Sequence, residues 1–192
     1  MKAIILLATL KKEGLSNTQT LSEFFVEELK KQKVECEIVK LPEFNIPPGT
    51  YTDMGKGDDW PAIFQKVKSA QIIIFATPVW WGNHSSEMQK VIERLDEVHD
   101  EILAGKKSQL EGKVAGIIIT GDSDGAEHII GNISNFMNAI GVLLPPYVTL
   151  SVLWEGHGKT AKTTRAQLMK KYKDEYSETA ETMAKQLLKY AG

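Results

Sequence analysis

A loop rich in hydroxyl, amide and amine side chains follows the first apolar run of the chain. It opens with Thr9 and Lys11 and ends with Ser16, Asn17 and Thr18, where a helical pattern begins. Hydroxyl groups, a lysine ammonium and the free backbone N–H groups of a helix N-terminus together bind phosphate. The loop therefore predicts a phosphate site. The same three final residues also suit a purely structural role as helix caps, which is their commoner use.

Two adjacent tryptophans stand in a second turn, which follows another apolar run. The turn consists of Pro78, Val79, Trp80, Trp81 and Gly82. Aromatic rings bind flat ligands by stacking, and a glycine allows a ligand to come close to the backbone. This composition is typical of a site for a planar molecule. In the alternative interpretation, the tryptophans cover the edge of the core or an oligomer interface, where tryptophan is enriched.

A third turn combines glycines with carboxylate and hydroxyl side chains, in the order Gly121, Asp122, Ser123, Asp124 and Gly125. Aspartates two positions apart occur in Ca²⁺ loops, but the twelve-residue pattern with its closing glutamate is absent. We interpret the two aspartates as turn and helix-cap residues. A polar loop of this kind also suits the hydrogen-bonding edge of a heterocyclic ring. The sequence predicts no metal site.

Each of these turns follows a short apolar run that is rich in isoleucine or valine. Five such runs occur, at residues 3–9, 34–39, 71–77, 114–120 and 147–153. They lack strict alternation, which is typical of strands that are buried on both faces of a parallel sheet. The gaps between them show helical spacing of apolar residues. Helices are expected from about residue 18, from Trp60, and across 88–98, 129–140 and 164–190.

This alternation predicts an α/β fold: a three-layer, doubly wound, parallel five-stranded sheet with the strand order 2-1-3-4-5. Residues 1–192 are expected to form one domain. Residues 41–59 are too rich in proline and glycine for a regular element, so they are expected to be a loop. In this topology ligands bind beyond the carboxyl ends of the strands, between the first and third strands. The three turns meet there.

The composition excludes several classes of protein. The 192 residues include 23 lysines and arginines against 25 aspartates and glutamates, and a net charge of -2 lacks the basic excess of nucleic-acid-binding proteins. No apolar stretch approaches the roughly 20 residues that span a bilayer. Lys11 and Lys12 follow the first apolar run, where a signal peptide would have its cleavage site. The single cysteine, Cys36, suits a reducing compartment, so we expect a cytoplasmic protein without membrane insertion.

Hydrolytic and thiol chemistry have no motif in this sequence. It holds no Gly-x-Ser-x-Gly elbow, no His-Glu-x-x-His, no Cys-x-x-Cys and no dinucleotide-binding glycine fingerprint. The triplet Gly158, Lys159 and Thr160 looks like the end of a P-loop. However, Leu153 stands where a P-loop needs glycine, and the flanking elements do not fit. Cys36 lies on the second predicted strand, away from the turns, and is expected to be inert.

The three turns together resemble those of the flavodoxin-like NAD(P)H-dependent FMN reductase family, over nearly the whole chain. The segments that carry the resemblance are residues 9–18, 77–95 and 120–128. It implies an FMN-dependent oxidoreductase, in which the cofactor carries the chemistry and no side chain is needed as a catalytic acid or base. Members commonly have a Gly-Ser pair and an arginine in the first loop, where this chain has Thr9, Leu10 and Lys11.

The resemblance also implies which residues bind FMN. The phosphate would contact Thr9, Lys11, Ser16, Asn17 and Thr18. The ring would lie against the second turn, Pro78, Val79, Trp80, Trp81 and Gly82, and the third turn, Gly121, Asp122, Ser123, Asp124 and Gly125. His128 or a second subunit would cover the outer face. The implied electron donor is NADH or NADPH, the acceptor a small molecule such as a quinone or a flavin, and the assembly a homodimer or higher homo-oligomer.

Two other functions stay open at this point. A flavodoxin-type electron carrier would have the same fold without its own reductase activity. Such carriers are usually strongly acidic, whereas this chain is near neutral and has Lys11 and Lys12 in its first loop, which favours the reductase. A flavin-free binding or scaffold protein of the same fold would use the two tryptophans at a protein interface.

Overall fold

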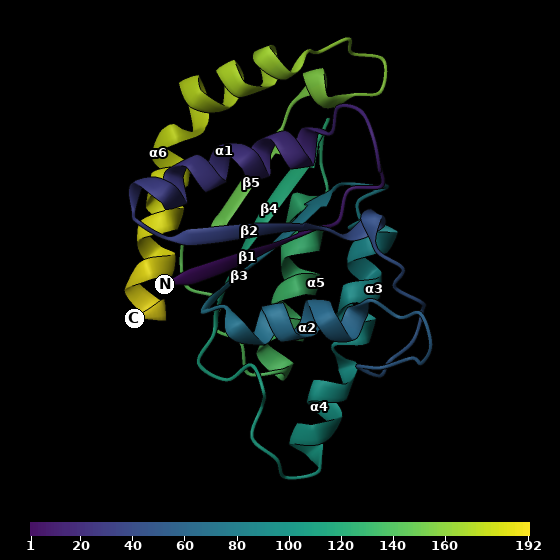
Figure 1. Ribbon diagram of the computed structural model, residues 1–192. Helices are drawn as coiled ribbons and strands as arrows, with labels where there is room; N and C mark the ends of the chain where they lie inside the picture. Colours follow the sequence, from purple (N-terminus) through teal and green to yellow (C-terminus); the bar gives the residue numbers. More distant parts are fainter.

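A sheet of five parallel strands forms the middle layer of the computed structural model, which describes residues 1–192 (Figure 1). The strands are β1 (Lys2–Leu7), β2 (Glu35–Lys40), β3 (Ile72–Pro78), β4 (Val114–Gly121) and β5 (Thr149–Leu153). Their order across the sheet is β2-β1-β3-β4-β5, and every neighbouring pair is parallel. The predicted doubly wound α/β fold and its strand order are therefore confirmed.

Helices cover both faces of this sheet. They are α1 (Asn17–Lys31), α2 (Trp60–Ser69), α3 (Ser86–Arg94), α4 (Asp96–Leu103), α5 (Ala126–Ala139) and α6 (Arg165–Ala191). One core lies under α1 and α6 and includes Phe24 and Tyr172. The other core lies under α2, α3 and α5 and includes Trp60 and Phe75. The sheet thus separates two apolar cores, as a three-layer architecture requires.

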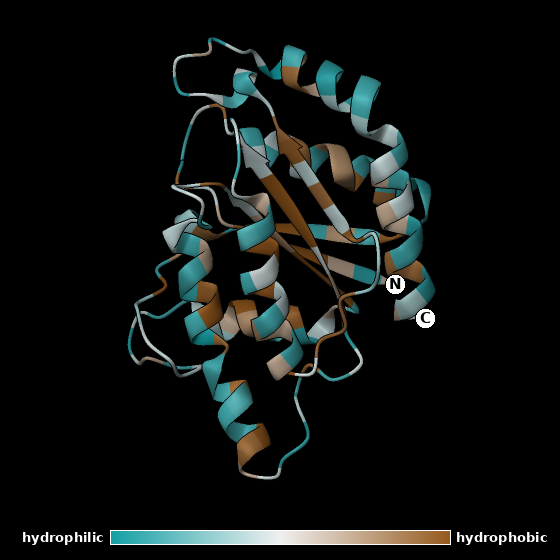
Figure 2. Ribbon diagram, turned by 180° about the vertical axis from the view of Figure 1, so that it is seen from behind, coloured by the Kyte–Doolittle hydropathy of each residue, from teal (hydrophilic) through white to brown (hydrophobic).

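The position of each strand in the sheet explains its burial. The central strands β3 and β4 and most of β1 are buried along their length, whereas the edge strands β2 and β5 alternate between less and more buried residues. A central strand has helices against both faces, so both sets of its side chains are apolar. Figure 2 shows this as nearly continuous brown along the central strands. The apolar runs without alternation therefore mark the middle of the sheet.

One predicted helix is two helices in the structure. The apolar spacing predicts a single helix across 88–98, but the chain turns at Leu95, so that α3 ends at Arg94 and α4 begins at Asp96. Leu95 and Val98 are each 1% exposed. Because the apolar spacing continues through the break, it does not reveal the change of direction.

Arg94 holds the long loop between β2 and α2 in place. The loop contains one regular turn, the 3-10 helix η1 (Leu41–Glu43). The Arg94 guanidinium forms an ion pair with Asp58, and both side chains are 0% exposed. It also donates hydrogen bonds to the backbone oxygens of Pro47, Tyr51 and Thr52, at 3.1, 2.7 and 2.9 Å. A loop without strands or long helices is thus ordered by one buried cation.

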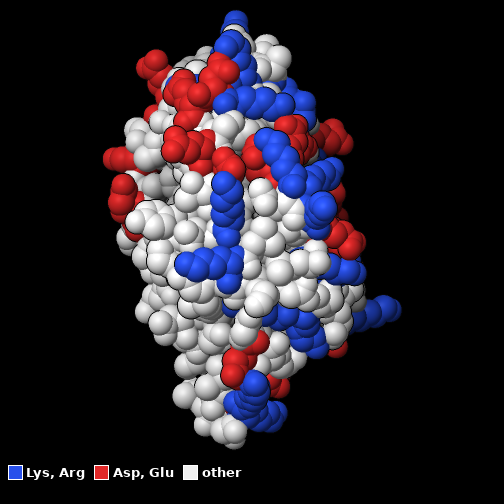
Figure 3. Space-filling model, turned by 90° about the vertical axis from the view of Figure 1, so that its left-hand side faces the viewer, with Lys and Arg blue, Asp and Glu red and all other residues white.

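Charges of both signs are mixed on the surface that Figure 3 shows, without a large area of one sign. Two ion pairs join helices α1 and α6: Arg165 with Glu23 at 2.8 Å, and Lys173 with Glu27 at 2.9 Å. Such exposed pairs contribute little to stability. No helix combines the length and the apolar character that crossing a membrane would need.

Candidate functional site

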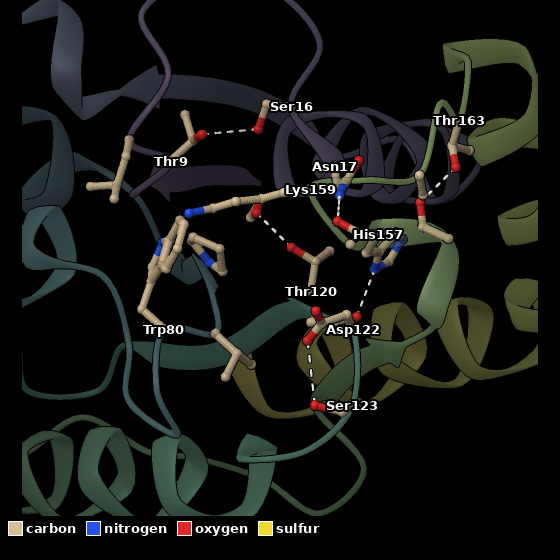
Figure 4. Close-up of a pocket in the computed structure, with 18 of the residues that line it drawn as sticks. Thr9, Ser16, Asn17, Trp80, Thr120, Asp122, Ser123, His157, Lys159 and Thr163 are labelled. Atoms are coloured by element: carbon tan, nitrogen blue, oxygen red, sulfur yellow. Dashed lines mark hydrogen bonds between the residues drawn. The ribbon is translucent and has the colours of Figure 1, made fainter.

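A cavity of about 750 Å³ lies at the carboxyl ends of the strands, where the loops after β1, β3, β4 and β5 meet (Figure 4). The predicted residues that line it are Thr9, Lys11, Ser16, Asn17, Thr18, Pro78, Val79, Trp80, Trp81, Gly82, Gly121, Asp122, Ser123 and Asp124. Parallel strands deliver their following loops to one edge, which explains how three turns far apart in sequence form one cavity. Its volume is typical of a site for a cofactor-sized molecule.

Ser16 both caps helix α1 and lines the cavity. Its Oγ accepts a hydrogen bond from the Gln19 N–H at 3.2 Å and donates one to Thr9 Oγ1 at 2.9 Å. The backbone N–H groups of Asn17 and Thr18 have no acceptor in the chain. These N–H groups form the positive end of the helix dipole, so this end of the cavity suits an anion. The structural role of Ser16 as a helix cap and the predicted role of this segment in binding phosphate are therefore compatible.

Two further side chains of the first loop are held by neighbouring groups. Thr18 Oγ1 and Thr120 Oγ1 share a buried hydrogen bond of 2.6 Å, which ties α1 to the end of β4. Lys11 Nζ donates to the backbone oxygen of Leu15 at 2.7 Å, and this contact closes the loop on itself. The loop is thus shaped before any ligand arrives, while its lysine stays at the cavity wall.

The tryptophan turn has an unusual backbone. Trp80 and Asn83 exchange two backbone hydrogen bonds, at 2.7 and 2.9 Å, and the central residues Trp81 and Gly82 have φ values of 52° and 74°. Positive φ at both central positions is the requirement of a type I′ turn, which prefers Asn-Gly. Trp81 is also 97% exposed. Strain and apolar exposure at one residue both oppose folding, and such costs are typical of functional sites.

Replacing Trp81 with Asn should therefore stabilise the protein. Asparagine tolerates the left-handed conformation, so the free energy of unfolding is expected to rise by about 1 kcal/mol, or the melting temperature by about 2–4 °C. Thermal unfolding followed by circular dichroism measures this. Trp81→Phe serves as the control, because it keeps the strain and should leave the melting temperature unchanged. A lower melting temperature for Trp81→Asn would show that Trp81 supports the fold.

The loop after β4 packs closely against the tryptophan turn. A Cβ atom on Gly125 would lie 2.7 Å from Cα of Gly82, and one on Gly121 would lie 2.9 Å from Val79. The interpretation of Asp122 and Asp124 as helix caps is wrong. Helix α5 has Gly125 at its N-cap, at φ 94°, without a side-chain cap. The reason is this close approach, which only a glycine allows at that position.

Gly125 and His128 do not line the main cavity. They lie in a shallow depression beside it, together with Trp81, Gly82 and Asp124. His128 is exposed on the first turn of α5. His128 therefore does not line the main cavity itself. That His128 or a second subunit covers the outer face of a bound ring stays a prediction.

The sequence analysis missed the fourth wall of the cavity. It is the loop between β5 and α6, which contributes Gly156, His157, Gly158, Lys159, Thr160, Ala161 and Thr163. The topology rule that located the other turns applies to this loop as well, since it also follows a strand at the carboxyl edge. The loop contains the triplet around Lys159 that lacks the context of a P-loop. Its polar residues were thus a usable signal.

His157 connects three walls of the cavity. Its Nδ1 bonds to the backbone oxygen of Gly121 at 3.0 Å, and its Nε2 bonds to the Tyr172 hydroxyl at 2.9 Å. Its own backbone oxygen accepts a hydrogen bond from Asn17 Nδ2 at 3.0 Å. Burial lowers the pKa of His157, against the raising effect of the Gly121 oxygen, and burial raises the pKa of Tyr172. Both groups are therefore neutral near pH 7 and position the loops.

The lowered pKa of His157 predicts a pH dependence of stability. The unfolded chain has the higher histidine pKa, about 6.5, so it takes up a proton more readily than the folded chain as pH falls. This contribution to stability is present above pH 6.5 and is lost as pH falls below it. Chemical denaturation measures the free energy of unfolding at pH 7.5 and at pH 5.5. Between these two pH values it should fall less for His157→Gln than for the wild type. His128→Gln, which changes an exposed histidine, should lose as much as the wild type.

Cys36 takes no part in this site. It lies on β2 at the edge of the sheet, and burial raises the pKa of its thiol to about 12. A thiol with so high a pKa is protonated at neutral pH and is a poor nucleophile. The expectation that Cys36 is inert and away from the cavity agrees with this position.

Comparison with known proteins identifies the family. The NADPH-dependent FMN reductase family model matches residues 1–154. The chain is 29% identical to the 8-demethyl-8-aminoriboflavin-5'-phosphate synthase of Streptomyces davaonensis over 170 residues, 83% of this chain and 65% of that protein. It is 30% identical to the divalent metal cation transporter MntH of Mycobacterium bovis over 151 residues, 76% of this chain and 22% of that protein. The chain thus spans less than two thirds of both curated relatives.

The crystal structure of RosB with a bound 8-demethyl-8-formylriboflavin-5'-phosphate has the same fold. It superposes with a TM-score of 0.79 at 23% identity, covering 100% of this chain and 79% of that chain. The family match ends at residue 154, so it includes the loops after β1, β3 and β4 but not the loop that contains His157 and Lys159. The matched part holds all five strands and most of the cavity. The chain therefore belongs to the NADPH-dependent FMN reductase family.

Proposed function

We propose that this protein is an FMN-dependent oxidoreductase. In this proposal NADH or NADPH reduces the bound FMN, and the electrons pass to a small-molecule acceptor such as a quinone or a free flavin. The observation that carries the proposal is the cavity at the strand ends, where the N-terminus of α1 and the tryptophan turn form opposite walls. Membership of the NADPH-dependent FMN reductase family supports the same cofactor and the same type of donor.

The cavity residues fit FMN. A phosphate needs donors, and the N–H groups of Asn17 and Thr18 have no acceptor in the chain. A flat ring needs an aromatic surface and polar groups at its edge, which Trp80 and the loop after β4 offer. Trp80 Nε1 is a buried donor without a hydrogen-bond partner. Since buried donors normally have a partner, an acceptor on a bound ring suits this position.

When bound, FMN supplies the redox chemistry by accepting a hydride and giving up two electrons. The residues of the chain bind the cofactor and orient it. The Thr18–Thr120 hydrogen bond holds α1 against β4, so the anion-binding N–H groups keep their place relative to the ring wall. His157 holds the fourth loop against the same two elements. No side-chain acid or base is required, so we assign no catalytic residue.

The names of similar proteins agree with a flavin phosphate as ligand. The Streptomyces davaonensis relative is described as a synthase of an aminoriboflavin-5'-phosphate, and RosB was crystallised with a formylriboflavin-5'-phosphate. Both compounds have the ring system and the phosphate of FMN, with another group in place of its 8-methyl. A flavin-free scaffold function has no comparable support.

We further infer a homodimer or a higher homo-oligomer in the cytoplasm. The resemblance to the FMN reductase family supports the oligomer, since a second copy would cover the shallow depression that contains Trp81 and His128. A free cysteine with a raised pKa suits a reducing compartment. Light scattering during size-exclusion chromatography tests the assembly. A fully active monomer would contradict the oligomer.

Anaerobic mixing of the FMN-loaded protein with NADH, and separately with NADPH, tests the proposed function. Loss of the visible absorbance of the flavin with either donor is the expected result. Retained absorbance with both donors, at full FMN occupancy, would leave the electron carrier as the better explanation. Reoxidation by added quinone or free flavin then compares the two classes of acceptor.

A further inference from the structure

Lys159 reaches across the cavity from the loop between β5 and α6. Its Nζ lies 4.5 Å from the centroid of the Trp80 ring, over the face of the indole (Figure 4). Both residues line the main cavity. Lys159 forms no ion pair or hydrogen bond with any residue of the chain, in contrast to Lys11, which donates to the Leu15 oxygen. The cavity thus contains a cation without an anionic partner.

The tryptophan wall of the cavity holds a second donor without an acceptor. The Nε1 of Trp80 is buried and has no hydrogen-bond partner. The ammonium of Lys159 and the indole N–H of Trp80 therefore both lack an acceptor, although they are close to each other. A buried or enclosed donor is stabilised when a ligand brings an acceptor to it. Whatever molecule binds along Trp80 must be rich in acceptors at this point.

We propose that Lys159 is the residue that stabilises the reduced flavin ring by pairing with its negative charge. This inference rests on the proposed function. A ring that binds in the cavity beside Trp80 also lies near the Lys159 ammonium, because both residues line the same cavity and the ammonium is 4.5 Å from the centre of the indole. The edge of the ring that contains N1 and the C2 oxygen is its acceptor-rich edge and suits the two free donors.

The charge balance of the reaction explains the role. Hydride transfer from NAD(P)H adds two electrons and one proton to the neutral ring, and the donor leaves as NAD(P)⁺. The ring therefore gains one negative charge, which is spread over N1 and the C2 oxygen. A cation beside that edge stabilises the reduced ring more than the oxidised ring, and so raises the reduction potential.

The phosphate of FMN is the other group that Lys159 could bind. The cavity already has donors for it at the N-terminus of α1, where the Asn17 and Thr18 N–H groups are free and Lys11 lies at the wall. The Lys159 ammonium is instead at the tryptophan wall. The two roles differ in what a substitution changes: a phosphate contact affects FMN but not riboflavin, whereas a ring contact affects the reduced form of either.

The test is the midpoint potential of FMN bound to Lys159→Met, measured by chemical reduction with an indicator dye and without NAD(P)H. We expect the variant to hold oxidised FMN about as tightly as the wild type and reduced FMN at least tenfold more weakly. A tenfold difference lowers the potential of a two-electron couple by about 30 mV. Lys159→Arg keeps the positive charge, so its midpoint potential should be close to that of the wild type. Lys162→Met, in the same loop but outside the cavity, should leave the potential unchanged.

Two results would overturn this inference while the proposed function stands. One is a Lys159→Met potential equal to that of the wild type. The other is a tenfold loss of oxidised FMN affinity with unchanged riboflavin affinity and unchanged potential, which would assign Lys159 to the phosphate. If the wild type binds no FMN, the proposed function fails and the inference fails with it.

Discussion

Replacing Ser16 with Asp is expected to weaken FMN binding at least tenfold, and riboflavin binding much less. Aspartate is as good an N-cap residue as serine, so helix α1 keeps its cap. Its carboxylate would stand beside the free N–H groups of Asn17 and Thr18, where the phosphate is proposed to lie. Two negative charges near 4 Å repel by about 4 kcal/mol at a surface-like dielectric, which exceeds the 1.4 kcal/mol of a tenfold change.

Fluorescence titration with FMN and with riboflavin measures this effect. Riboflavin lacks the phosphate, so its affinity should fall much less than that of FMN. Thr164→Asp is the matched control, because Thr164 caps α6 and does not line the cavity. It should change neither affinity. If Ser16→Asp lowers the affinities of FMN and riboflavin equally, Ser16 acts only as a cap and the phosphate lies elsewhere.

Replacing Arg94 with Met should reduce the free energy of unfolding by about 3–5 kcal/mol, the usual cost of leaving a buried charge without its partner. Asp58 is 0% exposed, and its ion pair with Arg94 is the main compensation for its burial. Burial alone would raise the pKa of Asp58, but the hydrogen bonds from Arg94 and from the backbone of Met54 and Trp60 hold it below its usual value. Denaturant unfolding at neutral pH measures the loss.

Arg165→Met is the matched control, since Arg165 is the only other arginine of the chain. Its ion pair with Glu23 is exposed, so its loss should cost less than about 1 kcal/mol. Because Arg94 lies outside the cavity, Arg94→Met should retain FMN affinity under conditions where it is folded. Equal destabilisation by both variants would show that the buried pair does not hold the loop between β2 and α2.

The sequence predicted the parts of the fold that depend on periodic burial. The apolar runs around Ile5, Ile74 and Ile118 became the three central strands, because a strand covered on both faces needs apolar side chains on both. The strand order followed from the right-handed crossovers. The break at Leu95 could not be predicted in this way. Apolar residues are buried both before and after the turn, so the apolar spacing continues through it.

The candidate site could be predicted where a loop combines a strand end with distinctive residues. Ser16 and Trp80 were found on those grounds, and both line the cavity. His157 and Lys159 were missed although their loop is polar and also follows a strand, because the triplet Gly158, Lys159 and Thr160 was weighed only as the end of a P-loop, which it does not match. Their contacts reach back to Gly121 and Trp80, and contacts over such separations depend on the tertiary structure. The same is true of Arg94 and Asp58, which are 36 residues apart.

Isothermal titration of the purified protein with FMN tests the central claim most directly, that the cavity at the strand ends binds this cofactor. The account predicts one FMN per chain with a dissociation constant of about 1 μM or tighter, equivalent to about -8 kcal/mol. Riboflavin should bind at least tenfold more weakly. No binding of FMN by folded protein, or equal binding of FMN and riboflavin, would contradict the account.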